Sequence, residues 1–200
     1  MLFRSSLLLF FILWQLCSVN SYKKLDNMNQ QLIGSLENVN FKIYSQYTLA
    51  SVKMQNKTLN SAKGKFSILA NYIFGGNSDN TQIAMTSPVI YSMSNYATFS
   101  FVMPDNYKVT NLPLPNSKEI TFKTEKNQCI ASLAFGGFVN HKNCKDNYLK
   151  LLKVLNANNI SHSNDYMIAV YNAPYQIINR KNEIWVEVNK EDVNNKLDNK

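Results

Sequence analysis

Two histidines are the side chains best suited to proton transfer near neutral pH, and both lie in polar segments. His141 and Cys144 form an H-x-x-C pair. Adding Cys129 gives three metal-ligating side chains, whereas a structural zinc site needs four. His162 lies in the polar run 158–164. We therefore predict no metal site and no catalytic residue, and we interpret both histidines as solvated loop residues.

Motifs that would name an enzyme class are missing from the sequence. It contains no G-x-S-x-G elbow, Walker loop, H-E-x-x-H or C-x-x-C. Glycine pairs occur at 75–76 and 136–137. A dinucleotide fingerprint needs its glycines between a strand and the start of a helix, whereas Gly75 follows a predicted helix. The sequence therefore favours a protein that is not an enzyme.

Aromatic side chains give a more positive indication. Tyr171 and Tyr175 flank a proline turn, and Phe135 and Phe138 border the second glycine pair. We assign most of these rings to the core, where such side chains are usually found. An apolar concave site edged by tyrosines and lysines would nevertheless suit a flat, anionic, aromatic ligand.

The charge balance suggests an anionic partner without indicating nucleic acid. Among 200 residues, 21 Lys+Arg oppose 13 Asp+Glu, which gives a net charge of +8. Adjacent basic pairs occur only at 23–24 and 180–181, whereas nucleic-acid readers concentrate Lys and Arg on one face. We predict no nucleic-acid partner. A content of 45% hydrophobic and 17% charged residues indicates one globular domain.

The first 21 residues have the layout of a secretory signal peptide. Arg4 precedes an apolar run over 7–14, and the small residues of 19–21 follow. The run is shorter than the roughly 20 residues of a spanning helix. We predict cleavage after Ser21, a secreted or periplasmic location and no membrane span after cleavage. An uncleaved anchor is the alternative.

The remaining chain divides into three parts. We expect a flexible lead-in over 22–35, a folded domain over 36–189 and a polar tail over 190–200. After cleavage, Cys129 and Cys144 remain in an oxidising compartment. They form either a disulfide or two free thiols, with Cys129 buried in a strand.

Hydrophobic periodicity predicts the elements of the folded domain. Apolar residues recur at i, i+3, i+4 and i+7 in two segments, each of which indicates a helix: Phe66, Leu69, Ala70 and Ile73 in the first, and Tyr148, Leu151, Leu152 and Leu155 in the second. Period-two patterns and apolar runs predict strands near 41–43, 49–54, 83–93, 97–103, 120–122, 129–138, 166–171 and 183–188. The order strand-strand-helix-strand-strand thus occurs twice, which predicts an α+β domain with two helices packed on an antiparallel sheet.

Seven segments resemble, in order, the motifs of the SOUL heme-binding protein family: 71–77 (NYIFGGN), 83–89 (IAMTSPV), 101–104 (FVMP), 112–115 (LPLP), 135–138 (FGGF), 171–174 (YNAP) and 180–185 (RKNEIW). The resemblance runs from about residue 36 to residue 188. It implies a distorted antiparallel β-barrel of two similar halves, each with one helix. It also implies non-covalent binding of heme or another tetrapyrrole, in a carrier or buffer role without a reaction.

The resemblance carries over part of a binding site. Some members have a proposed axial histidine where this chain has Ser45, so no iron ligand is expected. A basic position in the late turn matches Gln176, while Lys63 and Lys65 lie near a basic position of the first helix. We expect an apolar slot between that helix and the turn, with a basic rim, formed by Leu69, Tyr72, Ile73, Tyr171 and Tyr175 with Lys63 or Lys65.

Two other functions stay open. An enzyme acting on a small molecule in the same cleft is one, because similar folds host different functions. An acid or base pointing into the slot would favour it. An interaction module without a ligand is the other, and a slot filled by side chains would favour that module.

Overall fold

The computed structural model describes residues 28–62, 64–173 and 175–199, and the predicted signal peptide lies outside them. Its strands are β1 (Gln30–Leu36), β2 (Val39–Lys53), β3 (Val89–Ser92), β4 (Thr98–Val102), β5 (Ile120–Phe135), β6 (Met167–Val170) and β7 (Asn182–Glu187). Its helices are the 3-10 turn η1 (Leu59–Ala62), α2 (Lys65–Ile73), α3 (His141–Ala157) and α4 (Lys190–Asp198).

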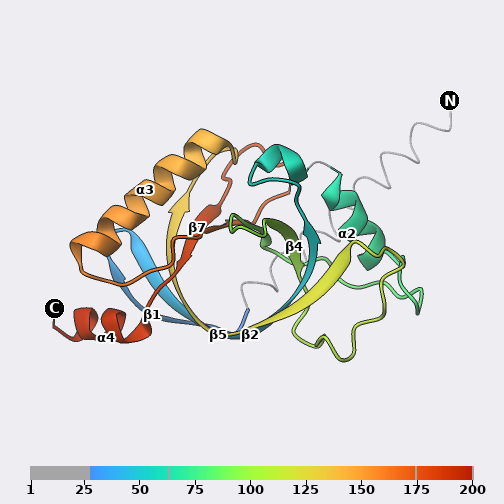
Figure 1. Cartoon of the computed structure of the whole chain (residues 1–200), viewed down its shortest axis with the longest axis horizontal. Helices are drawn as coiled ribbons and strands as arrows, with labels where there is room; N and C mark the ends of the chain where they lie inside the picture. The colour runs from blue at the N-terminus through green and yellow to red at the C-terminus, as the bar shows by residue number, and fades with distance from the viewer. Residues whose placement is uncertain (1–27, 63, 174, 200) are drawn as a thin grey trace.

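Six of these strands close into an antiparallel barrel. The strand order is β2-β4-β3-β6-β7-β5, and β5 pairs back onto β2. That closing pair is long, because its register runs from Val39 opposite Leu133 to Val52 opposite Ile120. β1 lies outside the ring, against the first half of β2. Figure 1 shows the ring with α2 and α3 on its outer side.

Alternate residues of each strand divide the core into two clusters. The outer cluster packs strand residues such as Phe41 and Ile184 together with buried side chains of α2 and α3. The inner cluster fills the barrel with Tyr44, Ile130 and Trp185, among others. Successive side chains of a strand point to opposite faces, so neighbouring residues such as Ile43 and Tyr44 belong to different clusters.

The α+β class, the antiparallel barrel and both predicted helices are confirmed. The strand count differs, because the segments predicted at 41–43 and 49–54 are one strand, β2, and those at 120–122 and 129–138 are one strand, β5. The polar run 123–128 hides the continuity of β5. Backbone pairing with β2 carries the strand through this run.

Both ends of the folded domain extend further than predicted. Residues 30–35 of the expected flexible lead-in form most of β1, and the expected polar tail forms α4. Asn189 caps α4 by accepting hydrogen bonds from the backbone N–H groups of Glu191 and Asp192. Val193 is buried and Leu197 lies over Gly34 of β1. A third helix therefore covers the barrel alongside the two that the sequence predicts.

The two described cysteines are free thiols, and both are buried. Cys129 lies in β5 and Cys144 in α3. Burial raises the pKa of the Cys144 thiol to about 11. The free-thiol alternative is the one that the structure adopts. Within the described ranges, no helix is long and apolar enough to cross a membrane.

Candidate functional site

The helix-side walls of the expected slot belong to the core. Leu69, Tyr72 and Ile73 lie on the face of α2 that packs on the barrel, and all three are buried. The Tyr72 hydroxyl donates a hydrogen bond to the Pro113 carbonyl at 3.0 Å, and its ring centroid lies 5.6 Å from that of Phe122. The protein's own side chains therefore fill the space beneath this helix.

Of the two lysines expected at the basic rim, the one that the structure describes already forms an ion pair. Lys65 Nζ lies 2.7 Å from Glu119 Oε2. Lys63 lies outside the described residues. A surface ion pair of this kind is worth at most about 1 kcal/mol, yet it gives Lys65 a partner within the chain.

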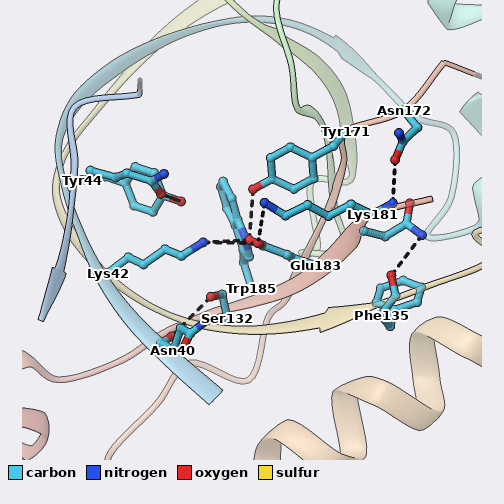
Figure 2. Close-up of polar contacts among 12 residues, drawn as sticks. Asn40, Lys42, Tyr44, Ser132, Phe135, Tyr171, Asn172, Lys181, Glu183 and Trp185 are labelled. Carbon is cyan, nitrogen blue, oxygen red and sulfur yellow. Dashed lines mark hydrogen bonds and ion pairs between the residues drawn. The ribbon is translucent and has the colours of Figure 1, made fainter. Parts of the chain in front are cut away.

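Tyr171 faces the barrel interior, where it joins a buried polar cluster around Glu183 (Figure 2). The Glu183 carboxylate accepts hydrogen bonds from Lys42 Nζ at 3.1 Å, the Trp185 indole N–H at 2.6 Å and the Tyr171 hydroxyl at 3.0 Å. Lys181 Nζ lies 3.6 Å from its other oxygen. We call these five residues the Glu183 cluster; it links β2, the end of β6 and β7 across the barrel.

The carboxylate of Glu183 is held in its ionised form. Burial alone would raise its pKa, because Glu183 is only 3% exposed. The Lys42 ammonium, the indole N–H of Trp185 and the more distant Lys181 outweigh this effect, so the pKa lies below its ordinary value. A carboxylate with three hydrogen-bond donors is suited to fixing the barrel interior more than to accepting a proton.

The sequence-predicted walls are therefore not brought together. Leu69, Tyr72 and Ile73 belong to the outer cluster, whereas Tyr171 packs against the inner one. These clusters lie on opposite faces of the sheet. Tyr175 lies on the turn between β6 and β7 and is half-exposed.

The turn that carries Tyr175 presents an exposed apolar surface. Ile177 and Ile178 are 73% and 76% exposed, and Phe138, at the β5–α3 connection, is 52% exposed. We call Phe138, Tyr175, Ile177 and Ile178 the turn surface. Arg180 joins its two segments, because its Cζ lies 4.8 Å from the Phe138 ring centroid and its Nη1 donates to the carbonyls of Ala173 and Gln176.

Sequence reasoning missed most of this surface. Ile177 and Ile178 are consecutive isoleucines that fit neither a strand nor a helix period. Two adjacent isoleucines in a turn that follows Tyr175 are the sequence feature that indicates an exposed apolar surface. In the sequence Arg180 is only half of a basic pair, because its contact with Phe138 joins residues that are distant in sequence.

The two histidines are not both solvated loop residues as predicted, because His162 is partly buried and His141 belongs to a helix. The ring nitrogens of His162 lie 2.9 Å from the Ser163 carbonyl oxygen and 3.1 Å from Asn156 Oδ1. His141 is the exposed first residue of α3. In the part of the chain that is described, no group of three or more His, Cys, Asp or Glu side chains could hold a metal ion.

Comparison with known protein families gives a match over most of the chain. Residues 25–187 match the model of the SOUL heme-binding protein family. The chain belongs to this family. The resemblance seen in the seven motifs is thus confirmed for this SOUL family member.

Relatives of this SOUL protein are distant. Heme-binding protein 1 of Xenopus laevis is 27% identical over 126 residues, which cover 58% of this chain and 65% of the relative. Heme-binding protein 2 of Homo sapiens is 26% identical over 131 residues, which cover 60% and 63%. The chain thus spans less than two thirds of the length of these two relatives.

Solved structures show the same fold at low identity. The C-terminal domain of EcmrR superposes with a TM-score of 0.59 at 12% identity, covering 78% of this chain and 99% of that domain. A hydrolase from Listeria innocua gives 0.54 at 6% identity, covering 78% and 94%. At these identities the likeness concerns the fold alone.

Proposed function

We propose that this SOUL protein is a secreted or periplasmic carrier or buffer that binds heme or another tetrapyrrole non-covalently at the turn surface. The observation that carries the proposal is the exposure of four apolar side chains, Phe138, Tyr175, Ile177 and Ile178, on two segments that the Arg180 side chain joins. Membership of a family described as heme-binding supports it. So do the names of the relatives, which are heme-binding proteins.

A tetrapyrrole suits this surface physically. Contiguous exposed apolar side chains mark interaction sites in soluble proteins, and covering them yields roughly 25 cal/mol per Å² of buried apolar area. The flat face of a tetrapyrrole supplies that area, and its carboxylates suit a neighbouring cation. Of the five wall residues predicted from sequence, Tyr175 is the one on this surface. The binding role involves no reaction.

We expect binding that depends little on iron. Ser45, at the position of the family's proposed axial histidine, is an exposed residue of β2 and supplies no imidazole. Hemin should therefore bind at micromolar concentrations, about −8 kcal/mol, through contact area and charge. Metal-free protoporphyrin should bind nearly as well. Absorbance titrations of the purified chain with both ligands measure the two affinities.

Two results would contradict this account. Hemin that bound far more tightly than protoporphyrin, with the preference lost in His141→Ala or His162→Ala, would reveal a histidine ligand to iron. Failure of both porphyrins to bind would refute the carrier function. That outcome would favour an interaction module instead, which the filled space beneath α2 also supports.

The secreted location has its own test. We expect exported protein to lack residues 1–21, because an apolar run of this length between Arg4 and 19–21 (VNS) is typical of a cleaved signal. Intact-mass measurement of the exported chain gives the new amino terminus. A mature mass that still includes Trp14 would rule out cleavage after Ser21 and favour an anchor.

A further inference from the structure

We propose that Asn56 is the acceptor of an N-linked glycan, an oligosaccharide that a transferase takes from a lipid pyrophosphate donor. The chain contains two N-x-[ST] sequons, at 56–58 (NKT) and 159–161 (NIS). Such a sequon is the acceptor motif for glycans in secreted proteins. The inference rests on the secreted location in the proposed function and goes beyond it by naming a modification site.

The first sequon lies in an exposed loop between β2 and η1. All three residues of 56–58 are exposed, whereas Met54, just before them, is buried. The Met54 N–H donates a hydrogen bond to the Ala97 carbonyl at 2.8 Å, and Ser61 Oγ donates to the Asn56 carbonyl at 2.8 Å. The backbone of this loop is therefore fixed on both sides of the sequon, while the sequon itself lies at the surface.

The carboxamide of Asn56 leaves its nitrogen available. Thr58 Oγ1 donates to Asn56 Oδ1 at 2.6 Å, so the hydroxyl that the sequon requires already contacts its asparagine. Asn56 Nδ2 has no hydrogen-bond acceptor among the described residues. The atom to which the glycan would attach therefore belongs to an exposed residue and gives up no existing hydrogen bond.

The second sequon is built into the fold. Ile160, its middle residue, is only 2% exposed. The Ser161 N–H donates to Asp192 Oδ2 at 2.9 Å, and the Ser161 hydroxyl hydrogen-bonds the same carboxylate. The Ser161 carbonyl accepts from the Asn189 N–H at 2.9 Å. A transferase would have to break these contacts in the folded chain, so Asn159 is accessible only before folding, whereas Asn56 is accessible before and after it.

The reaction forms one bond and breaks one. Asn56 Nδ2 bonds to the anomeric carbon of the first sugar, the bond from that carbon to the pyrophosphate oxygen breaks, and the lipid pyrophosphate leaves. The Nδ2 proton passes to a base of the transferase, and nothing is oxidised or reduced. Because Asn56 is exposed, the attached glycan extends into solvent and displaces no buried side chain.

The test is the mass of the full chain exported from cultured eukaryotic cells, before and after treatment with peptide N-glycosidase. This enzyme removes N-linked glycans and converts the asparagine carboxamide to a carboxylate. We expect the exported chain to lose the mass of a glycan on treatment, and peptide mapping to place the new carboxylate at position 56. Asn56→Gln should abolish this modification because the acceptor nitrogen is no longer correctly placed.

Three further variants separate the sequon from the loop. Thr58→Ala keeps the asparagine but removes the hydroxyl, so it should also abolish the glycan at Asn56. Thr58→Ser keeps the hydroxyl and should keep the glycan. Asn159→Gln is the matched control, because it removes the other sequon and should leave the glycan at Asn56 in place.

The outcomes separate the glycan site from the secreted location. Exported protein that lacks residues 1–21 but carries no glycan at Asn56 would refute the site while the secreted location stood. A glycan at Asn56 in Thr58→Ala would also overturn the proposal, because the modification would not depend on the sequon. Unmodified protein that kept residues 1–21 and stayed inside the cells would show that the secreted location fails, and the glycan site with it.

Discussion

Replacing Glu183 by glutamine is expected to lower the free energy of unfolding by about 3–5 kcal/mol. The side chain is buried in the barrel and lies 3.1 Å from Lys42 Nζ, which is buried as well. Glutamine removes the negative charge and leaves the Lys42 ammonium without compensation in a poorly solvated place. Urea unfolding of the two proteins measures the difference.

The double variant Lys42→Met/Glu183→Gln is the matched control. With the buried cation removed as well, the loss should be smaller than in Glu183→Gln alone, because no uncompensated charge remains. Lysine and methionine have side chains of similar length, so the packing changes little. The single variant Lys42→Met completes the comparison. If the double variant lost as much free energy of unfolding as Lys42→Met and Glu183→Gln lose together, the two charges would not stabilise each other.

The same carboxylate makes a pH-dependent contribution. Its folded pKa lies below the ordinary value of 4.5, so its contribution to stability is complete above about pH 4.5 and is lost as the pH falls through the folded pKa. Wild-type protein should therefore lose more stability on acidification below pH 4.5 than Glu183→Gln does. Parallel losses in both proteins would mean that Glu183 has no shifted pKa.

The second large effect concerns α2. Leu69→Ala is expected to cost about 2–5 kcal/mol, because the side chain is fully buried between α2 and the barrel and alanine would leave a cavity. Leu152, which belongs to the apolar stripe of α3, is only partly buried. Leu152→Ala should cost less, and unfolding curves of both variants test the ranking. A loss for Leu69→Ala no larger than for Leu152→Ala would contradict this placement of α2.

Local pattern was sufficient for the two main helices and the fold class. The stripes through Leu69 and Leu151 repeat at the helical period, and tertiary packing keeps them helical. The local pattern was insufficient for α4, because its segment 190–198 is almost entirely polar. This helix depends on contacts distant in sequence, such as Leu197 over Gly34 and the Ser161 N–H donating to Asp192 Oδ2.

The site was harder to predict than the fold. Apolar residues such as Leu69 and Ile73 suit either a core or a ligand slot, and only their burial distinguishes the two. The side of the sheet that Tyr171 faces follows from barrel closure, which no local pattern contains. The contact of Arg180 with the Phe138 ring joins two segments that are distant in sequence, which no local pattern displays.

The most direct test of tetrapyrrole binding at the turn surface is a hemin titration of a paired variant. Ile177→Ser/Ile178→Ser removes two exposed apolar side chains from that surface, and Leu114→Ser is the control, because Leu114 is an exposed loop residue outside it. All three side chains are exposed, so the variants should fold as the wild type does. We expect the double variant to bind hemin at least about tenfold more weakly, because a bound ligand would bury these side chains, and the control to bind like the wild type. Equal hemin affinity in the wild type and the double variant would contradict binding at the turn surface.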